Sequence, residues 1–154
     1  MSNYLEDRRK EFEKNRPLLR KNLFIIRKAA GWSAEALAER IGVAKRTILK
    51  IENGNSDEDM SKPVFISIMT ILYDEVSRKA EDDILCSVLG LIFNSDDLTD
   101  ENRTAAECFI SGLKSKTKAV DNKVANDGLK KIVGVTAITA ITASALLAII
   151  KKII

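Results

Sequence analysis

Five side chains that can contact a polyanion lie close together in the sequence: Lys45, Arg46, Thr47, Lys50 and Asn53. A guanidinium or ammonium group can donate to guanine O6 and N7 or to a phosphate. A threonine can contact a thymine methyl group or a phosphate. The alternative for the three cations is a solvated basic face. Either interpretation needs this stretch to be an exposed helix.

The composition argues against catalysis and metal binding. The chain has no histidine, which removes the commonest general base and metal ligand. Cys86 and Cys108 are too few for a disulfide framework and have no histidine with which to form a zinc site, so we expect two reduced, buried thiols. The acidic clusters 57–59 and 81–83 have no acid–base partner nearby, and we expect solvated surface. We therefore expect no enzyme activity, no metal and no cofactor.

Length and charge limit the architecture. With 154 residues, 45% of them hydrophobic and 31% charged, the chain has room for one domain or a small domain with an appendage. Few breakers (Gly 7, Pro 2) predict an all-α fold. The net charge is +6 over residues 1–56, −9 over 57–108 and +6 over 109–154. The basic first third favours nucleic acid over a membrane surface as partner, unless the segregated charges are only solvated faces.

The N-terminal region is too charged for a signal peptide. Its helical stripe of apolar residues is interrupted by Pro17, which suits the first turn of a helix. We therefore predict a charged lead-in over 1–16 and a helix over 17–30.

Two short helices should follow. Ser33 is a good N-cap for a helix over 33–40, and Gly42 can adopt positive φ in the turn after it. A third helix over 44–53 should stop at Asn53-Gly54-Asn55. Ser61-Lys62-Pro63 should open a fourth helix, with an apolar face formed by Phe65, Ile68, Met69, Leu72 and Val76.

The segment from Asn22 to Gly54 resembles the lambda-repressor-like helix-turn-helix family of Cro, repressor and XRE-type regulators. The resemblance covers about residues 18–75. The matching features are Arg27, Ser33, Leu37-Ala38, Ile41-Gly42-Val43, Thr47-Ile48 and Ile51-Glu52-Asn53-Gly54.

The resemblance implies roles for individual residues. The 44–53 helix would enter the DNA major groove with the exposed side chains named above. Ser33 would face a phosphate at the start of the second helix. Arg27 and Glu52 would form a structural ion pair. Many members have glutamine after the serine, where this chain has Ala34, so one DNA contact is expected to be missing. We expect Trp32 to be a core or rim residue.

The remainder of the chain is harder to assign. We expect a helical interaction module over 80–115, with helices at 81–93 and 99–115, and a basic linker over 116–131. The 84–93 segment is almost wholly apolar, so it should be deeply buried or a dimer interface. Residues 132–150 have no charge and would span roughly 28 Å as a helix. A transmembrane tail is the favoured interpretation of 132–154, ahead of an oligomerisation helix and a core helix.

The sequence therefore predicts a helix-turn-helix domain over 17–79 in a sequence-specific transcriptional regulator, a repressor of bacterial or prophage type. The alternative function is a protein-interaction or antitoxin-like module with the same fold. The expected partners are double-stranded DNA and a second copy of the chain. The expected location is cytoplasmic, with attachment to the cytoplasmic membrane if residues 132–150 span it.

Overall fold

The computed structural model describes residues 2–80, 83–93, 100–101, 104, 108 and 141–154. Every regular element in those ranges is a helix, which confirms the all-α prediction for the described residues. The elements are α1 (Ser2–Ala30), α2 (Ala34–Ile41), α3 (Lys45–Asn53), the 3-10 turn η1 (Asp57–Asp59), α4 (Lys62–Ser77), α5 (Ile84–Phe93) and α8 (Ala143–Ile153).

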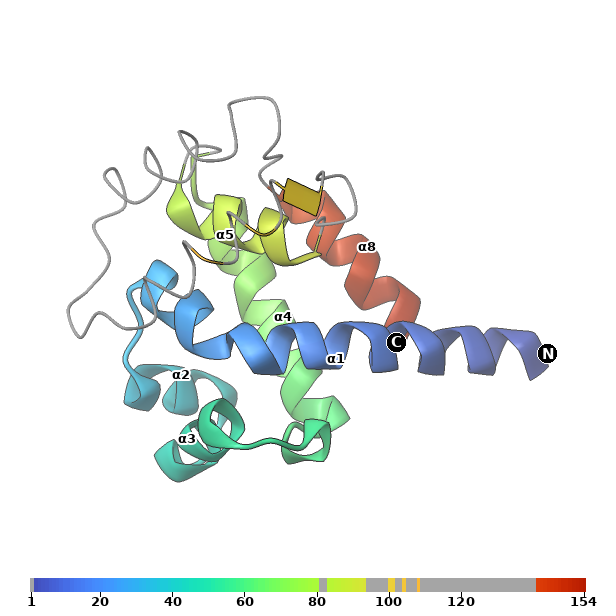
Figure 1. Ribbon diagram of the computed structural model, residues 1–154, viewed down its shortest axis with the longest axis horizontal. Helices are drawn as coiled ribbons and strands as arrows, with labels where there is room; N and C mark the ends of the chain where they lie inside the picture. Colours follow the sequence, from blue (N-terminus) through green and yellow to red (C-terminus); the bar gives the residue numbers. More distant parts are fainter. Residues whose placement is uncertain (1, 81–82, 94–99, 102–103, 105–107, 109–140) are drawn as a thin grey trace.

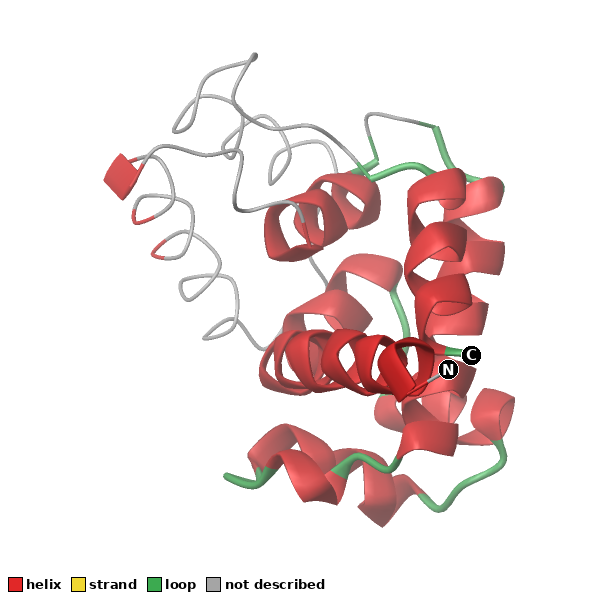
Figure 2. Ribbon diagram, turned by 90° about the vertical axis from the view of Figure 1, so that its right-hand side faces the viewer, coloured by secondary structure: helices red, strands yellow, loops and turns green. Residues whose placement is uncertain are grey.

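The long helix α1 separates two groups of helices. Helices α2 and α3 lie on one side of it, and α5 and α8 lie on the other (Figure 1). The view turned by 90° shows the same separation (Figure 2). Because α1 contacts α3, α4, α5 and α8, it is the element on which the others are assembled.

The predicted lead-in over 1–16 is wrong, since α1 begins at Ser2 and continues through Pro17. Proline removes one helical hydrogen bond, to the carbonyl of the residue four positions earlier. That residue, Glu13, is exposed. Packing offsets the lost bond: the ring of Phe12 meets that of Phe65 on α4 edge to face at 5.4 Å.

Helices α2 and α3 agree with the sequence prediction to within about one residue, the uncertainty of any helix boundary, and α4 starts at Lys62, where the sequence predicted that a fourth helix opens. Ser61 caps α4, because its side chain accepts a hydrogen bond from the amide of Val64. All five residues of the predicted apolar face of α4 are buried. The caps and the apolar periodicity in this part of the sequence were therefore sufficient to predict where these helices start and which face of α4 is buried.

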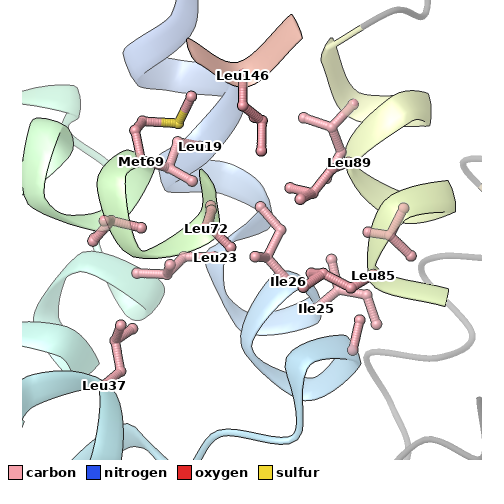
Figure 3. Close-up of a cluster of buried hydrophobic side chains, with 14 of the residues drawn as sticks. Leu19, Leu23, Ile25, Ile26, Leu37, Met69, Leu72, Leu85, Leu89 and Leu146 are labelled. Carbon is pink, nitrogen blue, oxygen red and sulfur yellow. The ribbon is translucent and has the colours of Figure 1, made fainter. Parts of the chain in front are cut away.

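Helix α5 is buried within the single chain. Residues 84–92 are all buried, and the side chains of Leu85 and Leu89 point towards α1 (Figure 3). The prediction of deep burial is confirmed. The alternative, a dimer interface formed by 84–93, is wrong because this surface is already covered.

Helix α8 corrects the favoured interpretation of the tail. The helix starts at Ala143, where the Thr142 hydroxyl accepts from the amide of Ala145. It packs on α4 and α1, and Leu146 enters the shared core (Figure 3). No helix among the described residues is long and apolar enough to span a membrane. Over 143–153 the tail is a core helix, the least favoured of the three alternatives.

Other expectations fall largely outside the described residues. These are the linker over 116–131, the first part of the tail over 132–140, and most of the helix predicted over 99–115. Within that last range positions 100, 101, 104 and 108 are helical. Cys86 is buried and Cys108 is exposed, so the expectation of buried thiols is correct for Cys86 and wrong for Cys108.

Candidate nucleic-acid interface

The turn between α2 and α3 has well-defined ends. The Ser33 hydroxyl accepts a hydrogen bond from the amide of Ala36 at 3.0 Å and so caps α2. At the other end Gly42 has φ 75°, and its amide donates to the carbonyl of Glu39 at 3.3 Å. A left-handed residue at this position reverses the chain at no steric cost only if it is glycine. The turn therefore sets the direction of α3 relative to α2.

Helix α3 presents a polar face to solvent and an apolar face to the core. Ile48 and Ile51, three positions apart, are fully buried. The predicted contact residues lie on the rest of the surface, with Thr47 half-buried and Lys45, Arg46, Lys50 and Asn53 exposed. The structure therefore brings together the five side chains that the sequence singled out.

The cations on α3 differ in their surroundings. Lys45 Nζ lies 3.6 Å from Glu35 Oε1, and Lys50 Nζ lies 3.8 Å from Asp59 Oδ1. Both lysine side chains remain more than half exposed, so these pairs are weak and open to competition from another anion. Among the described residues Arg46 has no carboxylate partner within ion-pair distance. Its guanidinium is the cation of α3 best placed to meet an external acceptor.

Arg27 on α1 and Glu52 on α3 form the ion pair that the resemblance implied. Arg27 Nε donates to Glu52 Oε1 at 2.7 Å, and Nη2 donates to Oε2 at 3.2 Å. The two side chains are only 8% and 4% exposed. Arg27 Nη1 also donates to the carbonyl of Trp32 at 3.1 Å, which ties the start of α2 to the same group. This prediction is confirmed.

The start of α2 carries one of the predicted DNA contacts, Ser33. Ser33 is exposed, as a phosphate contact would require, but Ala34 beside it is buried and has no polar side chain. Trp32 is half-buried, with the guanidinium of Arg40 4.9 Å from its ring centroid. It is a rim residue, as expected.

A nearly buried contact that the sequence did not reveal joins α1 to the loop after α3. Arg20 Nε lies 2.6 Å from Asp57 Oδ1, and Arg20 Nη1 donates to the carbonyl of Gly54 at 2.9 Å. Within the acidic cluster 57–59, Glu58 is exposed as expected, Asp57 is ion-paired but still 37% exposed, and Asp59 is only 19% exposed, so the expectation of solvated surface is wrong for Asp59. No local signal relates residues 20 and 57, because the pairing is made only by the fold.

Comparison with known proteins agrees with this geometry. The helix-turn-helix family model matches residues 23–58, a range that contains all of α2 and α3 and both residues of the Arg27–Glu52 pair. No curated protein and no solved structure matches the chain. A domain of this kind indicates DNA binding by an XRE-type regulator. Residues 23–58 form a helix-turn-helix domain of the Cro/C1 (XRE) type.

Proposed function

We propose that this protein is a sequence-specific DNA-binding regulator and that it acts as a repressor. The observation on which the proposal rests is the placement of α3. A short helix with exposed cations on its outer face is fixed to α1 by a nearly buried ion pair. A major groove about 12 Å wide accommodates such a helix.

We assign the contacts by chemistry and exposure. Arg46 donates to guanine O6 and N7, since it is exposed and has no competing carboxylate among the described residues. Lys45, Lys50 and Asn53 contact phosphates or base edges, and Thr47 contacts a thymine methyl group or a phosphate. Ser33 lies against a phosphate at the N-terminus of α2. With Ala34 in place of a polar residue, discrimination depends mainly on α3.

We also propose that two copies bind together. One helix-turn-helix module contacts only a few base pairs, so a pair of half-sites is needed for a specific operator. Half-sites about 34–36 Å apart would allow both recognition helices to enter the major groove on one face of the duplex. A bound pair would exclude other proteins from the same stretch of DNA, and that exclusion is the basis for proposing repression.

Duplex binding at varied salt tests the proposal. Each phosphate neutralised by a cation should contribute about −0.9 to the slope of log affinity against log salt. We expect a steep negative slope and a protected footprint with two-fold symmetry. Failure to bind any duplex at low salt would contradict the proposal and favour the alternative of a protein-interaction module.

A further inference from the structure

The side chain of Arg20 on α1 is nearly buried, which is unusual for an arginine. Its side chain is only 8% exposed, against 37% for its partner Asp57. It binds the carboxylate of Asp57 at 2.6 Å and the carbonyl of Gly54 at 2.9 Å. A nearly buried arginine with a carboxylate and a carbonyl as acceptors is held in one orientation, since its planar fork fixes the direction of each donor.

The segment that Arg20 binds is joined to the end of α3. Gly54 is the C-terminal cap of α3, with φ −78° and ψ 162°, an extended conformation open to any residue. Glycine is needed there for space, because an added Cβ would lie 2.6 Å from the Lys50 carbonyl oxygen and would also meet the Asp59 carboxylate. Asp59 in turn lies 3.8 Å from Lys50 Nζ. The contacts of Arg20 therefore continue through this loop to a proposed DNA-contacting residue.

Arg20 and Arg27 bind groups that are two residues apart, at the C-terminal end of α3. Arg27 binds Glu52 on the last turn of α3, and Arg20 binds the carbonyl directly after that helix. We propose that Arg20 is a positioning residue for the recognition helix: it fixes the C-terminal end of α3 and the loop 54–59, and thereby the placement of Lys50 and Asn53. This inference rests on the function proposed above.

A positioning role for Arg20 should matter more for binding to a specific operator than for general attraction to DNA. Loss of the Arg20 contacts should loosen residues 54–59 and let the end of α3 shift. Attraction of a basic domain to phosphates tolerates such a shift, because it depends on charge more than on geometry. Recognition of base edges requires hydrogen bonds of defined length and direction. Specific affinity should therefore fall more than non-specific affinity.

The experiment compares Arg20→Met with Lys14→Met in the 154-residue chain. Both variants remove one positive charge from α1, but Lys14 is exposed. Each is titrated against an operator duplex selected from a random pool and against a scrambled duplex. Arg20→Met should lose roughly 2- to 30-fold in operator affinity, the range for a residue that acts without touching the ligand. Its affinity for the scrambled duplex should match that of Lys14→Met.

Two further variants guard against a simple folding defect. Asp57→Asn removes the charged acceptor with little change of shape and should reproduce the selective loss. Arg20→Lys keeps the charge but not the fork, and should retain part of the operator affinity. Circular dichroism establishes that each variant is folded.

The outcomes separate the two proposals. If wild type prefers the operator and both Arg20→Met and Asp57→Asn bind it as well as Lys14→Met does, Arg20 has no positioning role. An equal loss on both duplexes would also overturn that role. If wild type itself shows no preference for any selected duplex, the proposed function fails instead.

Discussion

Arg20 and Arg27 stand nearly two turns apart on α1, and both guanidinium groups bind the C-terminal end of α3 or the residue that follows it. Arg27 reaches Glu52 at 2.7 Å, and Arg20 reaches the carbonyl of Gly54 at 2.9 Å. The beginning of α3 is held differently: its cap Ala44 makes no side-chain hydrogen bond, and the helix is joined to α2 by the turn at Gly42 and the exposed Lys45–Glu35 pair. The two nearly buried arginines of α1 therefore hold the C-terminal end of α3, while the turn sets its beginning.

Glu52→Ala should destabilise the domain strongly. It leaves the Arg27 guanidinium buried with the Trp32 carbonyl as its one remaining hydrogen-bond acceptor among the described residues. Breaking a buried pair by removing one partner costs about 3–5 kcal/mol. Urea denaturation followed by circular dichroism measures the change in the free energy of unfolding.

The double variant Arg27→Met/Glu52→Met is the matched control. Replacing both partners with apolar residues removes the stranded charge, so the double variant should be more stable than Glu52→Ala alone. If Glu52→Ala unfolds at the same urea concentration as wild type, the ion pair adds nothing to stability.

Arg46→Ala should weaken operator binding while leaving the fold intact. A base contact by an exposed arginine is worth about 1–3 kcal/mol, or roughly 5- to 150-fold in affinity. Its free energy of unfolding should stay within about 0.5 kcal/mol of wild type, because the side chain is on the surface. Lys14→Ala, on the exposed face of α1, should retain operator affinity. Equal affinity of the two variants would remove Arg46 from the interface.

Gly42 and Gly54 should respond differently to substitution, because one needs its backbone conformation and the other needs space. Gly42 has φ 75° and no described residue within 4 Å of an added Cβ, so Gly42→Ala should cost about 1–2 kcal/mol through its backbone conformation. Asparagine tolerates this conformation, so Gly42→Asn should cost less. Gly54→Ala should cost about 1–3 kcal/mol through overlap with the Lys50 carbonyl.

Gly54→Asn provides the discriminating comparison for the two glycines. A larger side chain cannot relieve the overlap at Gly54, so Gly54→Asn should be no more stable than Gly54→Ala in thermal unfolding. A gain in stability from asparagine at position 54 would mean that conformation, and not space, explains this glycine.

Leu146→Ala should show that α8 belongs to the core. Leu146 is fully buried between α8 and its neighbours, and a buried leucine truncated to alanine costs about 2–5 kcal/mol. Ser144→Ala, on the exposed side of the same helix, should change the free energy of unfolding by no more than about 0.5 kcal/mol. Thermal denaturation compares the two. Equal melting temperatures would place α8 outside the cooperative unit.

The helix-turn-helix could be predicted because its signals are local. Ser33, Gly42 and Ser61 each act on residues within a few positions, through a cap or a left-handed turn. The end of α3 at Gly54 was also located correctly, although the glycine is there for space and not for a left-handed conformation.

The parts that could not be predicted depend on tertiary packing. Pro17 is a local signal for a helix start, yet contacts such as Phe12 with Phe65 extend α1 past it. An uncharged apolar run such as 132–150 has no periodicity that separates a membrane span from a core helix. Arg20 and Asp57 are 37 positions apart, so only the fold brings them together.

The most direct test of the central claim is the ratio of two affinities at one salt concentration: that for a duplex selected from a random pool, and that for a scrambled duplex of equal length. If α3 reads the base sequence, the ratio should be about 10³ or more, with each mismatched base pair in a half-site costing about 1–3 kcal/mol. Equal affinities for the selected and the scrambled duplex would contradict sequence-specific recognition by α3.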